Sequence, residues 1–236
     1  MDWAKETLQK PMWKEEIKNR EAKEQVAKKM AERVQEGDII GFGSGSTSYL
    51  TAIEIAKKVQ TEHLNIIAIP TSYEIKMLCT YLGIPTATLE EKKPDWCFDG
   101  ADEVDHDNWM IKGRGAAMFN EKLNIKCSNK TYILVDESKI VNRLGSKFPV
   151  PVECTPKAIN LVKEEIYKQG AHNVELRLAQ KKDGPVITEN GNIILDAWFD
   201  NIDETLERRL KNITGVVETG LFIGYNVEII STKKNN

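Results

Sequence analysis

Acids, cations and glycines are concentrated in residues 99–122 of this chain. The segment contains Asp-Gly-Ala-Asp from Asp99, Lys-Gly-Arg-Gly from Lys112, and the pair Glu121-Lys122, after an apolar lead-in at 96–98. Proton transfer on a polar substrate requires an acid, a base and a cation close together, and loops present such groups well. This segment is therefore the first candidate for an active site.

A second candidate is the Gly-Ser-Gly-Ser-Thr segment at 43–47, between a predicted strand and a predicted helix. Glycines allow a sharp turn there, and the N–H groups at a helix start attract an anion. Hydroxyl groups from Ser44, Ser46 and Thr47 would complete a phosphate cradle. The loop lacks the lysine of a P-loop and the spacing of a dinucleotide fingerprint, so nucleoside triphosphates and NAD are disfavoured. An ordinary capped turn is the alternative, because Ser and Thr are favoured N-caps.

These segments resemble the signature of the ribose-5-phosphate isomerase type A family. That family carries a DGAD motif, a lysine followed by three glycines, a glutamate–lysine pair and a Ser-Gly-Ser-Thr phosphate loop. Matches at 148–153, 190–196, 215–217 and 220–222 extend the resemblance over nearly the whole chain. One position departs from the pattern, because Arg114 stands where the family has the middle glycine.

The resemblance implies interconversion of D-ribose 5-phosphate and D-ribulose 5-phosphate through a cis-enediolate, with no cofactor and no metal. It assigns Glu121 as the base that carries the proton between C2 and C1, and Lys112 as the cation that stabilises the enediolate oxygen. Asp99 would assist ring opening, and Asp102 would orient the sugar. The substrate-binding residues implied in the same way are Ser44, Gly45, Ser46, Thr47, Gly100, Ala101, Gly113, Arg114, Gly115 and Lys139.

Each of these residue patterns also has a purely structural interpretation. Acidic turns are commonly solvated, and we expect Glu103 and Asp105 to be surface charges or acceptors that stabilise a loop. The spacing does not fit a calcium-binding EF-hand loop. Most glutamates on helices are solvated too, but the neighbours of Glu121 one turn away are not cationic. The usual salt bridge at helical spacing is therefore missing, which favours a role in chemistry.

Arg114 leaves three possibilities open. If this position requires a positive φ, an arginine there is strained and the loop must differ from the family pattern. Alternatively, the side chain points outward, or it adds a second cation near the substrate.

Other functions remain to be distinguished. The chain could act on another small sugar phosphate, or it could be a non-catalytic sugar-phosphate sensor. Such sensors carry a DNA-binding domain, and the segment before Gly37 shows only one clear helix. An acyl-CoA transferase subunit would share the fold class, but the DGAD, lysine and glutamate constellation argues against it.

Hydrophobic periodicity predicts alternating strands and helices over the first 146 residues. Predicted strands are 39–42, 65–69, 94–98 and 132–135. Predicted helices are 15–34, a helix through Leu50, Ile53, Ile55 and Val59, a helix capped at 71–72 that ends near residue 83, and one from about 116 to 126. This alternation is typical of an α/β fold with a mainly parallel, Rossmann-like sheet and helices on both faces.

The pattern changes after Lys147, where prolines punctuate an extended segment. A helix is predicted over 156–169, a strand over 174–178, a turn at Asn190-Gly191 before a strand at 193–195, and a helix over 202–210. These elements indicate a smaller α+β domain at 147–218. The main domain would comprise 1–146 and 219–236, because a strand at the end of 220–230 is expected to return to the main sheet.

Composition bounds the remaining properties. The chain has 236 residues, 41% of them hydrophobic, and a net charge of -3, which gives no general reason to bind nucleic acid. It lacks an apolar run of the about 20 residues that span a bilayer. Four scattered cysteines indicate neither a zinc site nor disulfides. We expect a cytoplasmic enzyme acting on a small sugar phosphate, with no membrane or nucleic-acid partner. A homodimer or homotetramer is expected, with Trp3 and Trp13 as possible contact surface.

Overall fold

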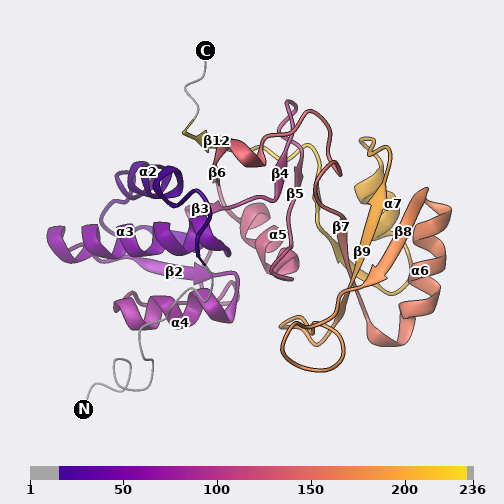
Figure 1. Ribbon diagram of the computed structural model, residues 1–236. Coiled ribbons are helices and arrows are strands. Elements are labelled where there is room, and N and C mark those ends of the chain that lie inside the picture. Colours follow the sequence, from indigo (N-terminus) through magenta and orange to yellow (C-terminus); the bar gives the residue numbers. More distant parts are fainter. Residues whose placement is uncertain (1–15, 233–236) are drawn as a thin grey trace. The chain divides into compact units, whose positions relative to one another are not determined.

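The fold is known from a computed structural model that describes residues 16–232. Trp3 and Trp13 lie outside the described residues. The chain forms two compact units (Figure 1). The first comprises Met1–Gly100, Asn120–Ser138 and Asn226–Asn236, and the second comprises Ala101–Phe119 and Lys139–Tyr225.

The first unit is built on a parallel sheet of five strands in the order β12-β6-β3-β1-β2. The strands are β1 (Ile39–Phe42), β2 (Ile67–Pro70), β3 (Trp96–Asp99), β6 (Lys130–Val135) and β12 (Glu228–Ser231). The helices are α2 (Arg20–Ala31), α3 (Ser46–Glu62), α4 (Tyr73–Leu82) and α5 (Met118–Cys127), of which α5 begins in the second unit. The α/β fold class is confirmed, and so is the return of the last strand to the main sheet.

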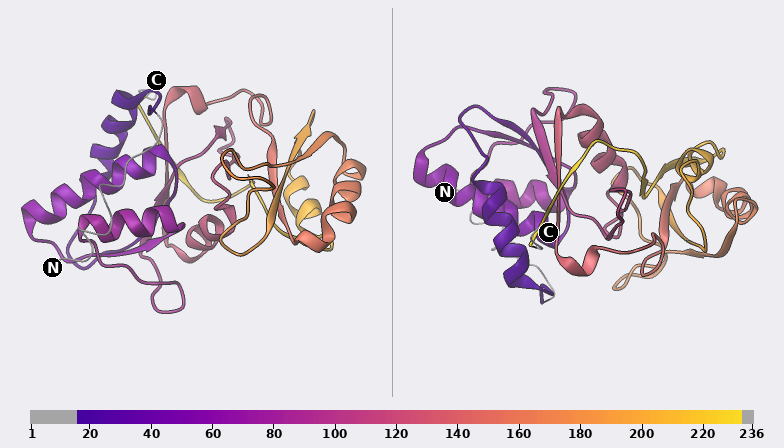
Figure 2. Two further views of the ribbon diagram at one scale, coloured as in Figure 1. Left: turned by 60° about the horizontal axis from the view of Figure 1, so that its bottom comes forward. Right: turned by 90° about the horizontal axis from the view of Figure 1, so that it is seen from above.

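Helices cover both faces of this sheet. Ile40 and Phe42 of β1 belong to one apolar core with residues of α2 and α3, and α2 packs against α3 (Figure 2). Successive side chains of a strand point to opposite faces. Gly41, between them, lies against Asn124 of α5, where an added Cβ would come within 3.2 Å of the Asn124 amide nitrogen. The apolar alternation therefore places α3 and α5 on opposite faces.

The second unit contains two antiparallel sheets, with strand orders β10-β7-β9-β8 and β11-β5-β4. Their strands are β4 (Glu103–Val104), β5 (Met110–Ile111), β7 (Val150–Cys154), β8 (Ala171–Leu176), β9 (Ile193–Phe199), β10 (Val216–Thr219) and β11 (Leu221–Phe222). Helices α6 (Ile159–Lys168) and α7 (Leu206–Lys211) contribute to the apolar core that contains alternate residues of β7 and β9. Short 3₁₀ turns are η1 (Glu137–Lys139) and η2 (Pro156–Ala158).

Helix boundaries differ from the prediction for local reasons. The helix predicted from residue 116 begins at Met118, because Ala116 has a φ of 61° and cannot belong to a right-handed helix. The helix predicted from residue 202 begins at Leu206. There the Asp203 carboxylate accepts hydrogen bonds from the Thr205 backbone N–H and hydroxyl, a local turn that competes with the helix.

The second unit includes the whole predicted small domain, 147–218, and extends beyond it on both sides. The added segments are 101–119, 139–146 and 219–225. Segment 101–119 carries β4 and β5. These two strands pair with each other, and β5 also pairs with β11, so neither belongs to the parallel sheet. The boundary at 147–218 stays a prediction. Within the described part of the chain, no helix has the length and apolar character needed to cross a membrane.

Candidate active site

The loop after β1 presents the start of α3 at the carboxyl edge of the parallel sheet. Gly45 is the N-cap residue of α3, with a φ of 88°, a conformation that favours glycine. As a glycine, this N-cap residue has no side chain that could cap the helix. The N–H groups of the first turn of a helix have no intrahelical acceptor, so they can hold an anion. This geometry supports the predicted phosphate cradle at 43–47.

Two side chains from other elements brace this loop. The Ser44 and Thr71 hydroxyl oxygens are 2.7 Å apart, and Thr71 directly follows β2. From α2, the buried Lys23 ammonium donates to the Ser46 hydroxyl at 3.0 Å. Sequence analysis missed Lys23. Its spacing from Val26 and Met30 places it on the buried stripe of the helix, and a lysine on such a stripe is a signal that could have found it.

The charge of Lys23 is balanced by Asp136, 3.8 Å away at the end of β6. Asp136 is 2% exposed and also accepts hydrogen bonds from the Asn19 side chain and the Ser138 backbone N–H. Burial opposes ionisation of Asp136, but these hydrogen bonds and the Lys23 charge outweigh it and hold its pKa below the usual value. The pair therefore keeps a cation beside the loop.

Asp99 is the last residue of β3 and is 2% exposed. Its Oδ1 accepts the Gly100 N–H at 2.7 Å and the Ser44 N–H at 3.1 Å. Gly43 makes this approach possible, because a Cβ there would lie 2.3 Å from the Asp99 carboxylate. The structure thus brings Asp99, Gly100 and Ser44 together, as the predicted site requires.

Glu121 lies in the first turn of α5 and is 5% exposed. Two asparagines fix this helix to the end of β2. The Asn120 amide donates to the Thr71 carbonyl at 3.1 Å, and the Asn124 amide donates to the Ile69 carbonyl at 2.9 Å. Glu121 is therefore held on a rigid element between two anchors. Ligands of open parallel sheets bind at this carboxyl edge.

The predicted lysine segment lies in the second unit, and we call residues 112–116 the lysine loop. Lys112 is 2% exposed, and its Nζ lies 5.6 Å from the centre of the Phe222 ring. Its backbone N–H donates to the Gly220 carbonyl at 2.9 Å. An added Cβ at Gly220 would come within 2.2 Å of the Lys112 carbonyl oxygen, so this approach requires glycine. A buried ammonium over a ring face is stabilised by cation–π attraction.

The strain considered for Arg114 does not arise. In the described residues, the lysine loop places its positive φ angles at Gly113 (102°) and Ala116 (61°), not at Arg114. Arg114 is exposed, and its N–H donates to Asp102 Oδ2 at 3.1 Å. The departure from three glycines is therefore accommodated without a left-handed arginine, and the backbone N–H of residue 114 joins Asp102 to the lysine loop.

Two acids behave as loop acceptors. Buried Glu103 accepts hydrogen bonds from the backbone N–H groups of Gly145, Lys147 and Phe148. Asp105 accepts from the N–H groups of Asp107 and Trp109 in the β4–β5 hairpin. Both are acceptors that stabilise a loop, as expected, although Glu103 is buried rather than on the surface.

The predicted residues are divided between the two units. The first unit holds Ser44, Gly45, Ser46, Thr47, Asp99, Gly100 and Glu121, and the second holds Ala101, Asp102, Lys112, Gly113, Arg114, Gly115 and Lys139. The chain passes from one unit to the other after Gly100, Phe119, Ser138 and Tyr225. The first three crossings lie within two residues of a predicted site residue. Lys139 is half-buried, with its Nζ 4.9 Å from the centre of the Phe148 ring.

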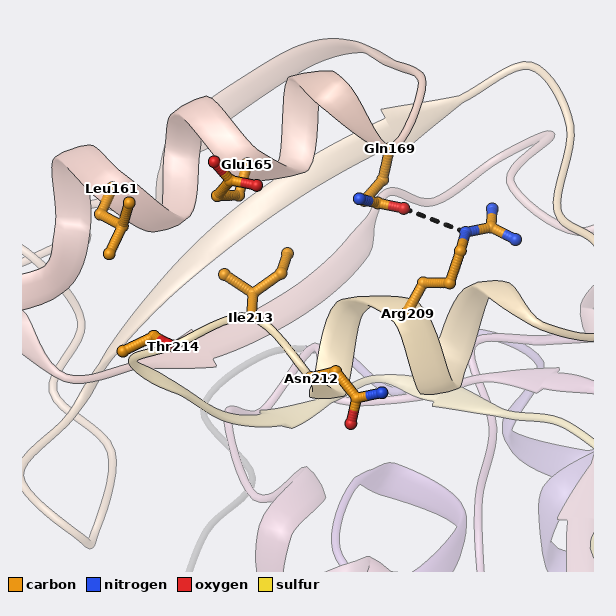
Figure 3. A pocket seen from close by; sticks show the side chains of 7 residues that line it. All are labelled: Leu161, Glu165, Gln169, Arg209, Asn212, Ile213 and Thr214. Carbon is orange, nitrogen blue, oxygen red and sulfur yellow. Dashed lines mark hydrogen bonds between the residues drawn. The ribbon is translucent and has the colours of Figure 1, made fainter.

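A cavity of about 450 Å³ in the second unit contains none of these residues (Figure 3). It lies between α6 and the end of α7, and Gln169 accepts a hydrogen bond from Arg209 at its rim. The Arg209 guanidinium also contacts the Asp203 carboxylate. The arginine that lines the cavity is thus already engaged, and the one acid of the lining, Glu165, lies there without any residue of the predicted site.

Comparison with known proteins identifies the family. The sequence model of ribose 5-phosphate isomerase A (phosphoriboisomerase A) matches residues 67–236. The chain is 43% identical over 221 residues to the ribose-5-phosphate isomerase A of Methanocaldococcus jannaschii, covering 92% of this chain and 97% of that protein. The chain belongs to the ribose 5-phosphate isomerase A family.

Other members of the ribose 5-phosphate isomerase A family agree in sequence and fold. A Synechococcus ribose-5-phosphate isomerase A is 45% identical over 86% of this chain and 88% of that protein. The solved Methanocaldococcus jannaschii isomerase has a TM-score of 0.88 at 41% identity, covering 92% of this chain and 96% of its own. A D-ribose-5-phosphate isomerase solved in complex with phospho-erythronic acid has a TM-score of 0.85 at 39% identity, covering 89% and 94% of the two chains.

Proposed function

We propose that this chain interconverts D-ribose 5-phosphate and D-ribulose 5-phosphate. Family membership supports the reaction, and one structural observation carries the mechanism. Glu121 is buried on a helix that two asparagines fix to the sheet edge where Asp99 and the anion loop lie. A carboxylate held in this way is suited to act as a general base.

The reaction begins once the sugar ring is open. Glu121 takes the proton from C2, the electron pair of that C–H bond forms the C1–C2 double bond, and the carbonyl electrons move to O1. This gives a cis-enediolate. A proton then passes from O2 to O1, and Glu121 returns its proton to C1. The product is the ketose, and the glutamate is again ionised, so the cycle consumes no redox cofactor.

Two further groups stabilise the charges that develop. The Lys112 ammonium faces the enediolate oxygen, a role that is worth about 3–4 kcal/mol for comparable oxyanion donors. Asp99 exchanges the hydroxyl proton during ring opening, and Asp102 orients the sugar. Backbone groups of Gly100, Ala101, Gly113, Arg114 and Gly115 line the sugar, as the family resemblance implies.

The phosphate binds at the start of α3. The phosphate oxygens accept hydrogen bonds from the backbone N–H groups there and from the hydroxyls of Ser44, Ser46 and Thr47. The Lys23 ammonium donates to the Ser46 hydroxyl at 3.0 Å, which orients this hydroxyl and strengthens it as a donor to the phosphate. Lys139 adds a second cation. Binding energy at the phosphate then positions the reacting carbons.

The test is turnover of ribose 5-phosphate by the purified protein, followed as ketose formation. Glu121→Gln should lower kcat by about 10²–10⁴-fold with KM little changed, because only proton transfer is lost. Glu62→Gln, at an exposed position at the end of α3, is the matched control and should retain full activity.

Two outcomes would favour the alternatives. Tight binding of ribose 5-phosphate without turnover by the wild type would indicate a sugar-phosphate sensor. Faster turnover of another pentose or tetrose phosphate would indicate a different substrate, with exposed Arg114 as the first residue to examine. Full activity of Glu121→Gln would overturn the assigned base.

We also propose that the protein acts in the pentose phosphate pathway, is located in the cytoplasm and forms a homodimer or homotetramer. All four cysteines are free thiols, which suits a reducing compartment. Light scattering on the full chain would give the oligomeric state, and a monomer at working concentration would contradict this part.

A further inference from the structure

Arg177 joins the lysine loop to the larger antiparallel sheet of the second unit. It directly follows β8, and its Nη1 donates to the Gly113 carbonyl at 2.7 Å and to the Arg114 carbonyl at 3.0 Å. These are the two carbonyls that come immediately after Lys112. One guanidinium therefore holds two successive carbonyls of the backbone that follows the lysine.

The guanidinium is itself fixed from β9. Its Nε donates to Asp196 Oδ2 at 2.8 Å, and its Nη2 donates to Asp196 Oδ1, so the pair is bidentate. The two side chains are 16% and 19% exposed. Such planar, two-bond pairing fixes the guanidinium plane, which a lysine cannot reproduce.

The fold explains why Asp196 is available for this contact. Leu195 and Ala197 belong to the apolar core that contains residues of α6 and α7. Because strand residues alternate between faces, Asp196 lies on the opposite face of β9. Polar contacts of this second face therefore do not disturb the core.

The lysine loop has further fixed points on either side of the Arg177 contacts. The Lys112 N–H is held by the Gly220 carbonyl, and the Ala116 N–H donates to the Gly113 carbonyl at 3.0 Å. The Gly113 carbonyl thus accepts hydrogen bonds from both Arg177 and Ala116, and Gly113 itself has a φ of 102°. Loss of Arg177 would remove its bonds to the Gly113 and Arg114 carbonyls, while the Ala116 N–H bond to Gly113 and the Lys112 N–H bond to Gly220 would stay in place.

We infer that Arg177, oriented by Asp196, is a positioning residue for catalysis that acts through Lys112. The inference rests on the proposed function, since it requires the Lys112 ammonium to stabilise the reaction intermediate. Arg177 itself contacts neither reacting atoms nor phosphate in this role. It sets where the buried ammonium is held, and a displacement of about 1 Å at a reacting group can cost on the order of 100-fold in rate.

Arg177→Met tests the inference by its kinetics. We expect kcat for ribose 5-phosphate to fall roughly 10- to 100-fold with KM little changed. Arg177→Lys should recover only part of this loss, because lysine lacks the fork that reaches two carbonyls and a carboxylate together. Arg209→Met is the matched control, since Arg209 also pairs with an aspartate in the second unit, while its side-chain hydrogen bonds in the described residues go to Gln169, Asp203 and Thr205. It should retain wild-type kcat.

A double-variant cycle separates positioning from a general structural role. Lys112→Met should itself lower kcat, and adding Arg177→Met to it should change kcat by no more than about twofold, because the two residues act as one unit. Losses that multiply in the double variant, or a wild-type kcat in Arg177→Met, would overturn the inference.

Hydrogen exchange gives a second readout that does not depend on turnover. The backbone amides of 113–118 should exchange faster in Arg177→Met than in the wild type or in Arg209→Met. Unchanged exchange there would also overturn the inference. A wild type that binds ribose 5-phosphate without converting it would refute the proposed function instead, while exchange would still report on the loop.

Discussion

At the scale of single residues, the site depends on close approaches that a side chain would block. Asp99 and Gly43 are the clearest pair, because any Cβ at residue 43 would lie 2.3 Å from the carboxylate and 2.6 Å from the Asp99 Cα. Gly43 does not have a positive φ, so other residues could adopt its backbone conformation. Glycine is needed there because a larger residue would not fit. The same argument holds for Gly220 beside Lys112.

Gly43→Ala should therefore displace Asp99 and impair catalysis. We expect kcat for ribose 5-phosphate to fall by about 100-fold, because the added methyl group would push the Asp99 carboxylate away from the Ser44 N–H that donates a hydrogen bond to it. Steady-state kinetics checks this, with melting temperature measured in parallel. Gly37→Asn is the control, because residue 37 has open space around it and asparagine tolerates positive φ. Wild-type kcat in Gly43→Ala would contradict the prediction.

At the scale of elements, α2 supplies a lysine to the anion loop at 43–47. Lys23 reaches Ser46 at the start of α3, and Asp136 at the end of β6 holds the lysine in place. Three elements thus converge on the anion loop. Helix α5 adds rigidity of another kind, since its two asparagines fix Glu121 relative to β2.

Lys23→Met should weaken phosphate binding more than it slows chemistry. A hydrogen bond to a charged group is worth about 1.5–3 kcal/mol, so KM for ribose 5-phosphate should rise roughly 10- to 100-fold while kcat changes less. Inhibition by inorganic phosphate should weaken in parallel. Lys28→Met, on the exposed face of the same helix, is the control and should leave KM unchanged. An unaltered KM in Lys23→Met would exclude Lys23 from the phosphate site.

Asp136→Asn should change how stability depends on pH. The pKa of Asp136 is below its usual value in the fold, so its ionised form stabilises the protein fully above the unfolded pKa of about 3.9. That stabilisation is lost as the pH falls through the folded value. At pH 7 we expect the free energy of unfolding of the variant to be about 1–3 kcal/mol below that of the wild type. This difference should become smaller below about pH 4, because Asp136 is then increasingly protonated in the wild type.

Urea unfolding at several pH values measures this difference. Asp183→Asn, at an exposed position, provides the comparison and should follow the wild type throughout. A difference between Asp136→Asn and wild type that stays constant down to pH 3 would show that ionisation of Asp136 is not the cause.

At the scale of the whole molecule, each unit has its own apolar core and its own protected thiol. Cys79 is buried in the first core, where burial raises its pKa to about 12. Cys154 is buried in the second, where burial and the neighbouring Glu153 charge raise its pKa to about 11. Cysteine reacts as the thiolate, so neither thiol is poised to react at neutral pH.

A thiol reagent at pH 8 should therefore label half-buried Cys127 first, and Cys79 and Cys154 only after unfolding in urea. Peptide mapping by mass spectrometry identifies the labelled positions. Rapid labelling of Cys79 or Cys154 in the native protein would mean that the corresponding core opens readily, against the burial described above.

The family and the parallel fold can be predicted from local patterns in the sequence, and so can the residue types of the candidate site. Strand β1 was predicted at its observed bounds, because Ile39–Phe42 is apolar and flanked by glycines. Helix α4 was also located well, since Ser72 and Gly83 are strong cap signals. These signals can be recognised in a single sequence because caps, turns and apolar periodicity each involve only a few neighbouring residues.

Which distant residues support the candidate site could not be predicted, because long-range packing brings them together. Lys23 and Asp136, or Arg177 and the carbonyl groups after Lys112, are far apart along the chain, and no local pattern pairs them. The tertiary structure also decides that Arg114 avoids a positive φ, while Ala116 adopts one. These outcomes depend on which strands pair and which face each residue occupies, and long-range packing sets both.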